Sequence, residues 1–375
     1  MLKKMIRAFA LLLVMVFSIG ATGLFLNTLF LGKGIQKSRP KSEPVNLAVM
    51  DRFGMYMTNR ISTALDGVLD IEKVYWLTDD VQVAPEPNRE LFGYSFDPST
   101  LGWLLEDAKK ILKGQNTLFS TETKLAPNTK AEYYLDDTIF AVTWKQPFND
   151  TMYTISEIKI AHPSQFRRFL AGGSYGSGIQ MITSDMAANV NAVVASSGDF
   201  YAFRRMGVIV YDGVVQRTNP AIDTCYIDTQ GDLIFSRRGE LATVEEAQAF
   251  VDANDIRFSV AFGPLMIENG VKQDYTGYVL GEVVYYYSRA ALCQMDDLHY
   301  LLITAGKEGN YQNAVTVAQF QDQIASFGVR HAYALDGGQT AVIVMNNKVI
   351  NSVLFGYQRN ISDIIYFATA IPSGE

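Results

Sequence analysis

Two carboxylates in this chain stand where a predicted strand ends beside glycine. Asp336 follows an apolar run and precedes Gly337 and Gly338, while Asp199 follows Gly198 behind a second apolar run. Glycine has no side chain, so a ligand or another backbone can approach the neighbouring carboxylate closely. Two such carboxylates fit glycoside chemistry, in which one protonates the leaving oxygen and the other activates water or attacks the anomeric carbon. Asp336 and Asp199 are therefore the candidate catalytic residues.

A tight turn explains the same residues without any chemistry. An aspartate before glycines often accepts hydrogen bonds from nearby backbone amides and so stabilises a turn. The sequence does not show that Asp336 and Asp199 meet in space. The sequence therefore allows two interpretations of Asp336 and Asp199: a catalytic pair, or two residues that stabilise turns.

Basic residues near these segments supply positive charge for an anionic ligand. Arg289 is flanked by apolar and small residues, where an unpaired guanidinium is costly, so it binds either a carboxylate of the protein or an anionic ligand. Its planar fork suits phosphate. Arg204 adds charge shortly after Asp199, although a solvated surface position explains it equally well. The candidate residues for binding substrate or phosphate are Arg289, Arg204, Lys307, Gly198, Gly337, Gly338 and Gln339.

The remaining composition argues against metal and nucleic-acid chemistry. The three histidines, His162, His299 and His331, have no metal-binding spacing, and we expect structural or surface roles for them. The two cysteines, Cys225 and Cys293, are too far apart for a thiolate zinc site, although one disulfide between them stays open. A net charge of -7 leaves no dominant basic face for a phosphate backbone. We expect no nucleic-acid partner and no cofactor, with a structural Ca²⁺ left open.

The N-terminus carries a segment long enough to cross a membrane. The run Ala8–Gly32 contains no charged residue and follows Lys3, Lys4 and Arg7. A membrane span needs about 20 apolar residues, whereas a signal-peptide core has about 7–15. We therefore expect an uncleaved signal anchor over residues 1–37 rather than a cleaved signal peptide.

The rest of the chain predicts an α+β protein. It has 375 residues, 48% of them hydrophobic and 19% charged, which is enough for a globular core. A linker and partly helical spacer at 38–130 precede a domain at 131–373, in which many short strands and a few helices indicate a large mixed or antiparallel sheet. The predicted strands are 153–160, 193–195, 207–211, 331–335 and 341–345; the predicted helices are 45–77, 101–112, 163–171 and two that begin at capping boxes on Thr243 and Thr316; 83–98 is predicted as a loop.

Four segments, in this order, resemble the phosphodiester glycosidase family. They are 184–201, Phe262–Leu265, Arg289 with the alanines after it, and Leu335–Gly338, within a resemblance that spans about 151–367. The family includes the uncovering enzyme, N-acetylglucosamine-1-phosphodiester alpha-N-acetylglucosaminidase, and many bacterial envelope proteins. The resemblance implies a sheet-rich α+β domain with its site at strand ends. It also implies a single-pass protein of the cell membrane with an extracytoplasmic C-terminal domain.

The chain departs from the family pattern at three places. Ser197 replaces an asparagine, Lys307 replaces an arginine, and Gln339 and Thr340 replace a glycine and a serine. The first change removes an amide that can bind sugar hydroxyls, and the second replaces a bidentate fork by a point charge. These changes bear on which sugar is bound.

Two functions from different classes follow from the resemblance. The leading hypothesis is a glycosidase that hydrolyses a glycosyl-1-phosphodiester on a cell-envelope polymer or glycan, with the membrane contacted through the N-terminal helix. The alternative is a non-catalytic envelope glycan-binding or exopolysaccharide assembly protein with the same fold. A metal-dependent phosphodiesterase needs ligand clusters that the sequence lacks.

Overall fold

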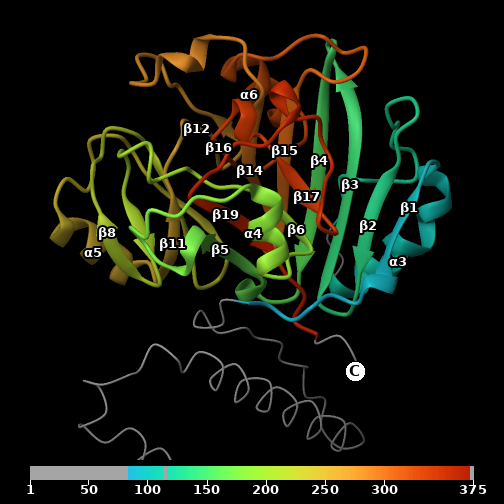
Figure 1. Cartoon of the computed structure of the whole chain (residues 1–375), viewed down its shortest axis with the longest axis horizontal. Helices are drawn as coiled ribbons and strands as arrows, with labels where there is room; N and C mark the ends of the chain where they lie inside the picture. Colours follow the sequence, from blue (N-terminus) through green and yellow to red (C-terminus); the bar gives the residue numbers. More distant parts are fainter. Residues whose placement is uncertain (1–82, 113–115, 372–375) are drawn as a thin grey trace, which may run out of the picture. The chain divides into compact units, whose positions relative to one another are not determined.

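The computed structural model describes residues 83–112 and 116–371. It confirms the α+β class, with large antiparallel sheets and few helices (Figure 1). The predicted membrane anchor at 1–37 and the predicted helix at 45–77 lie outside the described residues. Within those residues, no helix is long and apolar enough to span a bilayer.

A nine-stranded sheet forms the centre of the described chain. Its neighbouring strands are antiparallel and follow the order β1-β2-β3-β4-β15-β14-β16-β12-β13. The bounds are β1 Phe92–Ser95, β2 Ala131–Leu135, β3 Ile139–Phe148, β4 Thr151–Ile160, β12 Leu265–Glu268, β13 Val271–Lys272, β14 Arg289–Asp296, β15 His299–Gly306 and β16 His331–Leu335.

Three smaller groups of strands accompany this sheet. A five-stranded sheet has the order β18-β17-β6-β19-β5, a three-stranded sheet has the order β10-β9-β11, and β7 pairs with β8. Their bounds are β5 Phe166–Leu170, β6 Val194–Ser197, β7 Ile209–Tyr211, β8 Val214–Arg217, β9 Thr224–Asp228, β10 Leu233–Ser236, β11 Ile256–Val260, β17 Ile343–Met345, β18 Lys348–Val349 and β19 Asp363–Phe367.

The helices are short. Thr243 and Thr316 each begin a helix with the predicted capping box, so both predictions are confirmed. The α-helices are α3 Gly102–Ile111, α4 Thr183–Asn189, α5 Val244–Ala253 and α6 Val317–Ala325. The 3₁₀ helices are η2 Arg89–Leu91, η3 Pro98–Leu101, η4 Pro163–Gln165, η5 Ala171–Gly173, η6 Gly281–Val284, η7 Gly338–Thr340 and η8 Leu354–Gly356.

The two faces of the nine-stranded sheet bury different partners, because side chains alternate along a strand. In β15, Leu301 and Ile303 belong to the core cluster that contains Phe320 of α6. Leu302 of the same strand belongs to the cluster that contains Phe367 of β19, in the five-stranded sheet. The large sheet therefore lies between α6 on one face and the five-stranded sheet on the other.

Two sequence predictions were wrong because pairing with distant strands overrides local propensity. Residues 163–171 were predicted as a helix, but only the two ends are helical, in η4 and at the start of η5, and Phe166–Leu170 form β5, which pairs with β19 about 200 residues later. Residues 83–98 were predicted as a loop, but Phe92–Ser95 form β1, which pairs with β2. The helix predicted at 101–112 is confirmed by α3.

A buried charge cluster joins the strands that carry the loop after β6. Arg168 of β5 contacts Asp199 through Nη2 at 2.9 Å and Asp363 of β19 at 3.0 Å, and all three side chains are fully buried. The Nε atom of Arg168 also donates to Asp363 Oδ2 at 3.1 Å. A buried charge needs such a partner, because desolvation of a lone ion is far too costly.

The same cluster fixes the backbone after β6. The Asp363 carboxylate accepts hydrogen bonds from the backbone N–H of Asp199 at 3.2 Å and of Phe200 at 3.0 Å. The Asp199 carboxylate accepts one from the N–H of Ala261 at 2.7 Å. The carbonyl of Gly198, in this loop, then accepts the N–H of Asp336 at 3.4 Å. The charge cluster therefore positions the backbone on which Asp336 depends.

We predict that Gly198→Ala destabilises the fold strongly. A Cβ atom at this position would overlap the Asp363 carboxylate, and overpacking at a rigid site typically costs about 1–3 kcal/mol or more. The melting temperature should fall by more than about 5 °C in a thermal melt. Gly102→Ala is the control, because its Cβ would meet nothing closer than Thr121 Cγ2 at 3.8 Å. Equal melting temperatures for the two variants would contradict the role given to this contact.

Candidate active site

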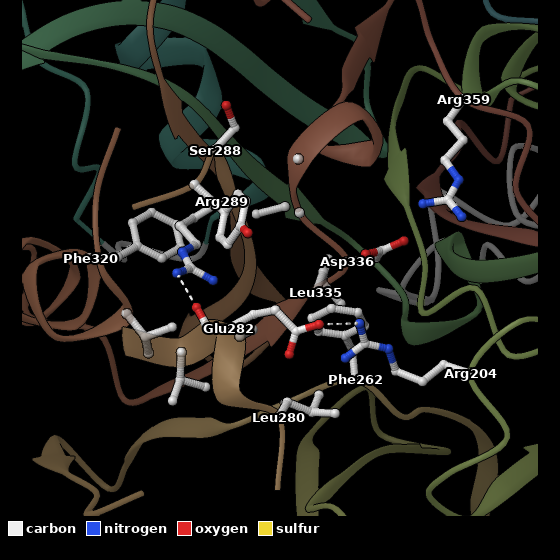
Figure 2. A pocket seen from close by; sticks show the side chains of 18 residues that line it. Arg204, Phe262, Leu280, Glu282, Ser288, Arg289, Phe320, Leu335, Asp336 and Arg359 are labelled. Carbon is white, nitrogen blue, oxygen red and sulfur yellow. Dashed lines mark hydrogen bonds and ion pairs between the residues drawn. The ribbon is translucent and has the colours of Figure 1, made fainter. Parts of the chain in front are cut away.

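A cavity of about 260 Å³ opens where the start of β14 lies beside the end of β16 (Figure 2). Its charged lining residues are Arg204, Glu282, Arg289, Asp336 and Arg359. Its apolar wall includes Phe262, Leu280, Val283, Val317, Phe320 and Leu335. Apolar walls with a few converging charged groups are typical of small-ligand sites.

Asp336 is a half-buried carboxylate at the end of β16. Burial raises its pKa to about 6, and Thr340, Arg204 and Arg359 oppose that rise in part. A carboxyl with a pKa near neutral exchanges protons readily at working pH, which general acid–base catalysis requires. Figure 2 shows the Asp336 carboxylate between the guanidinium groups of Arg204 and Arg359.

The glycines after Asp336 let the chain pack against β14. A Cβ on Gly337 would lie 2.6 Å from the carbonyl oxygen of Ser288, the residue before β14. The N–H of Gly338 donates to that same carbonyl at 2.8 Å, and Gly338 has a φ of 66°, which glycine adopts without strain. Both glycines line the cavity. They bring the Asp336 turn against the strand that carries Arg289.

Arg204 carries a buried donor that has no partner. Its Nη2 atom lies 3.3 Å from Glu282 Oε1, and its guanidinium carbon lies 4.5 Å from the centre of the Phe262 ring. Its Nη1 atom is buried and makes no hydrogen bond to the described residues. Leaving a buried charged donor unsatisfied is costly. An anionic ligand in the cavity would remove that cost.

Arg289 uses most of its guanidinium to hold a loop. Its Nη2 atom donates to the carbonyls of Glu282 at 2.8 Å and Tyr285 at 2.5 Å, and its Nε atom donates to Val315 O at 3.2 Å. Its protein partners are thus backbone carbonyls, and no carboxylate of the described chain pairs with it. Burial lowers the pKa of Arg289 to about 10, so it stays charged at neutral pH. Arg289 both lines the cavity and shapes the loop over 282–287.

Arg359 lies at the exposed edge of the cavity on two aromatic rings. Its guanidinium carbon is 4.9 Å from the ring centre of Phe200 and 5.1 Å from that of Phe203. The two rings stack on each other at 5.3 Å. Such cation–π contacts orient a guanidinium while leaving its N–H groups available to a ligand.

Of the two predicted catalytic carboxylates, only Asp336 lines the cavity. The Asp199 side chain is fully buried, and its oxygens accept from Arg168 Nη2 at 2.9 Å, Tyr201 N at 2.8 Å and Ala261 N at 2.7 Å. Burial raises the pKa of Asp199, with Arg168 opposing that change. The structure therefore places Asp199 in the charge cluster behind the cavity. The predicted meeting of Asp199 and Asp336 in one cavity does not occur.

The second carboxylate of the cavity is Glu282, which the sequence did not single out. It lies in η6, with no strand or glycine pair beside it to mark it. Arg168 and Asp363 were also missed as functional residues, although both lie within the resemblance that spans about 151–367. Arg168 carried no local signal, because its partners are far away in the sequence.

Three other predicted binding residues, Lys307, Gln339 and Gly198, are not among the residues that line the cavity. Lys307 is exposed and is not among the lining residues. Gln339 is half-buried beside the lining glycines, and its Nε2 atom is buried without a hydrogen-bond partner. Gly198 does not line the cavity, but its carbonyl accepts a hydrogen bond from the backbone N–H of the lining residue Asp336.

The histidines and cysteines lie outside the lining of this cavity. His299 pairs with the buried Glu157 at 2.7 Å, and His162 caps η4. Cys225 and Cys293 are buried and unpaired, so the disulfide left open by the sequence is not formed. The described residues contain no group of three or more His, Cys, Asp or Glu side chains that suits a metal ion.

Comparison with solved structures supports the fold. A hypothetical protein from Synechocystis superposes with a TM-score of 0.51 at 13% identity, covering 64% of this chain and 64% of that one. The catalytic domain of zebrafish N-acetylglucosamine-1-phosphodiester alpha-N-acetylglucosaminidase, solved in a form auto-inhibited by its pro-peptide, superposes with a TM-score of 0.52 at 15% identity, covering 69% of this chain and 92% of that one. This chain thus spans less than two thirds of the Synechocystis protein.

The family comparison agrees with the sequence motifs. No curated protein matches the chain. Residues 189–368 match the family model described as phosphodiester glycosidase, and they include Asp199, Arg204, Glu282, Arg289, Asp336 and Arg359. The chain therefore contains, at residues 189–368, a domain of the phosphodiester glycosidase family.

Proposed function

We propose that this chain is a glycosidase that hydrolyses a glycosyl-1-phosphodiester. The observation that carries the proposal is the charge arrangement of the cavity, where Arg204, Arg289 and Arg359 surround Asp336 and Glu282. Three positive against two negative side chains leave an excess of one positive charge, in a chain whose net charge is -7. A local positive site in an acidic protein favours an anionic substrate. The family to which residues 189–368 belong supports a phosphodiester as that anion.

Arg204 is the proposed main contact of the scissile phosphate. Its buried Nη1 donor has no partner among the described residues, and a phosphate oxygen is the strong acceptor that such a donor needs. Arg289, held by three backbone carbonyls, adds a fixed positive charge to the same cavity. Fixed charges aimed at the leaving group stabilise the transition state without reorganisation.

Asp336 is the proposed base. A departing phosphate monoester holds its negative charge well, since its second pKa is about 6, so it needs little help from an acid. Water attacks the anomeric carbon and gives its proton to the Asp336 carboxylate. The bond between that carbon and the phosphate oxygen breaks, and the oxygen keeps the electron pair. The products are the free sugar and a phosphate monoester.

We further propose a cell-envelope polymer or glycan as the substrate, reached by a domain anchored through the N-terminal segment. The support for this part is the uncharged run at Ala8–Gly32 and the resemblance to envelope proteins. The rival function, a glycan-binding protein without catalysis, differs from the proposal only in turnover.

Asp336→Asn should remove hydrolysis and keep the fold. Loss of a general base typically lowers the rate by about 10²–10⁴. Because the pKa of Asp336 is raised by burial to about 6, its ionised form lowers stability as pH rises from about 4 to 6. The variant should therefore melt no lower than the wild type at pH 8. Assays on a sugar-1-phosphodiester and thermal melts on the same sample check both points, with the exposed Asp185→Asn as an unaffected control. Near-normal turnover in Asp336→Asn would contradict the role of this base.

Asp199→Asn should show the opposite pattern. Removing one partner of a buried ion pair costs about 3–5 kcal/mol, so the melting temperature should fall by about 10 °C. Turnover per folded molecule should change by less than about threefold, because the Asp199 side chain does not line the cavity. Activity normalised to the folded fraction from circular dichroism checks this. A stable but inactive Asp199→Asn protein would return Asp199 to the catalytic pair.

The pH dependence of kcat/KM should have one acid limb. Asp336 is protonated below a pH of about 6, so activity should fall as pH drops through that value and stay level above it. Arg204 lowers the pKa of Asp336, so Arg204→Gln should move the limb to higher pH. Profiles from pH 4.5 to 9, in steps of about half a unit, measure both positions. Activity that falls on the alkaline side instead would make Asp336 an acid.

A further inference from the structure

Arg359 is the cation of the cavity that the proposed chemistry does not use. It is exposed, and the described residues offer it no carboxylate partner. Its guanidinium lies over the stacked rings of Phe200 and Phe203. A guanidinium that is oriented by aromatic rings and left unpaired presents its donors to an outside acceptor. Arg204, in contrast, pairs with Glu282 and has a buried donor that makes no hydrogen bond to the described residues.

Exposed aromatic side chains extend the surface beside Arg359. Phe203 is 65% exposed, Phe355 is 74% exposed and Tyr357 is 64% exposed. Phe355 also has a φ of 64°, a conformation that is strained for a bulky residue. Its helix η8 contacts η7, which begins at the lining residue Gly338.

We propose that Arg359, on the Phe200–Phe203 stack, is a second phosphate-binding subsite beside the scissile one. The proposal rests on the proposed function and specifies its substrate as a chain of sugars joined by phosphodiesters. One phosphate binds at Arg204, and the next phosphate, one sugar away, binds at Arg359. The intervening sugar lies against the exposed rings of Phe203, Phe355 and Tyr357. The two arginines flank Asp336 in Figure 2, as two successive phosphates around the reacting carbon require.

Arg359 gives the cavity a second cation, besides Arg204, that lies close to Asp336. Arg204 and Arg359 both lower the pKa of Asp336, so both lie close enough to act on the same carboxylate. A single phosphate on Arg204 leaves the Arg359 guanidinium without an ion-pair partner among the described residues. A second phosphate satisfies it by a charge-assisted hydrogen bond.

Binding of two product-like probes tests the subsite without any hydrolysis. The purified full-length chain is titrated with a hexose 1-phosphate, whose phosphate corresponds to the scissile one, and with a hexose 1,6-bisphosphate, which carries a second phosphate one sugar away. The wild type should bind the bisphosphate at least about tenfold more tightly, as one extra hydrogen-bonded charge pair gives. Arg359→Ala should remove that preference and leave the affinity for the monophosphate unchanged.

Arg205→Ala is the matched control. Arg205 is exposed, lies next to Arg204 in the sequence and is not among the residues that line the cavity. Arg205→Ala removes one positive charge, as Arg359→Ala does. A loss of non-specific attraction for anions would therefore be the same in both variants. The tenfold preference should persist in Arg205→Ala. Phe355→Gly, which relieves the strained backbone, should keep or raise the melting temperature while reducing the preference.

Each other result overturns the subsite. Equal weakening of both probes by Arg359→Ala would place Arg359 on the scissile phosphate instead. Equal affinities of the wild type for both probes would show that no second subsite exists. The result is separate from the proposed function: a wild type that prefers the bisphosphate but cleaves no sugar-1-phosphodiester keeps the subsite and loses the glycosidase assignment.

Discussion

The site depends on one buried charge cluster, in which Arg168 lies between Asp199 and Asp363. The three side chains are fully buried, so each charge persists only because the others and nearby backbone amides neutralise it. Arg168 and Asp363 come from paired strands of one sheet, and Asp199 comes from the loop after the neighbouring strand. Charge pairing therefore fixes a loop that has no regular structure of its own. The backbone N–H of Asp336 donates to the carbonyl of Gly198 in this loop, so the loop helps to position Asp336 at the cavity.

The cavity itself combines two opposing electrostatic requirements. Burial raises the pKa of Asp336, which makes it a stronger base, while Arg204 and Arg359 lower it and keep it largely ionised at neutral pH. The arginines proposed to bind an anionic substrate thus also set the ionisation of Asp336, the proposed base. Both guanidinium groups are oriented by their contacts, because Arg204 lies on Phe262 and pairs with Glu282, and Arg359 lies on Phe200 and Phe203. Such fixed charges are the means by which enzymes stabilise a developing charge.

Much of the fold was predictable from the sequence, because it follows from local patterns. Alternating apolar residues gave β4 and β16, and the capping boxes at Thr243 and Thr316 gave the starts of α5 and α6. The failures were β1 and β5, whose residues become strands only through distant partners. Local propensity contains no information on such pairing.

The candidate site was predictable from the sequence only where a residue has a local signal. The glycines beside Asp336 and the apolar surroundings of Arg289 are local signals, and both residues line the cavity. Asp199 gave the same local signal as Asp336, yet its carboxylate turns into the core toward Arg168. An aspartate beside glycine at a strand end is therefore predicted to lie close to another part of the backbone. Whether its carboxylate faces a cavity, as in Asp336, or a buried cation, as in Asp199, depends on the tertiary structure. Glu282 had no local signal, because the loop that carries it is shaped by Arg289.

The proposed glycosidase reaction requires that water attacks the anomeric carbon rather than phosphorus. Hydrolysis of a sugar-1-phosphodiester in ¹⁸O-labelled water, followed by mass spectrometry of both products, distinguishes the two points of attack. If Asp336 delivers water to carbon, the heavy oxygen appears in the anomeric hydroxyl of the released sugar, and the phosphate monoester contains none from solvent. Label in the phosphate monoester, with an unlabelled sugar, would mean cleavage of the phosphorus–oxygen bond and would contradict the glycosidase account of this cavity.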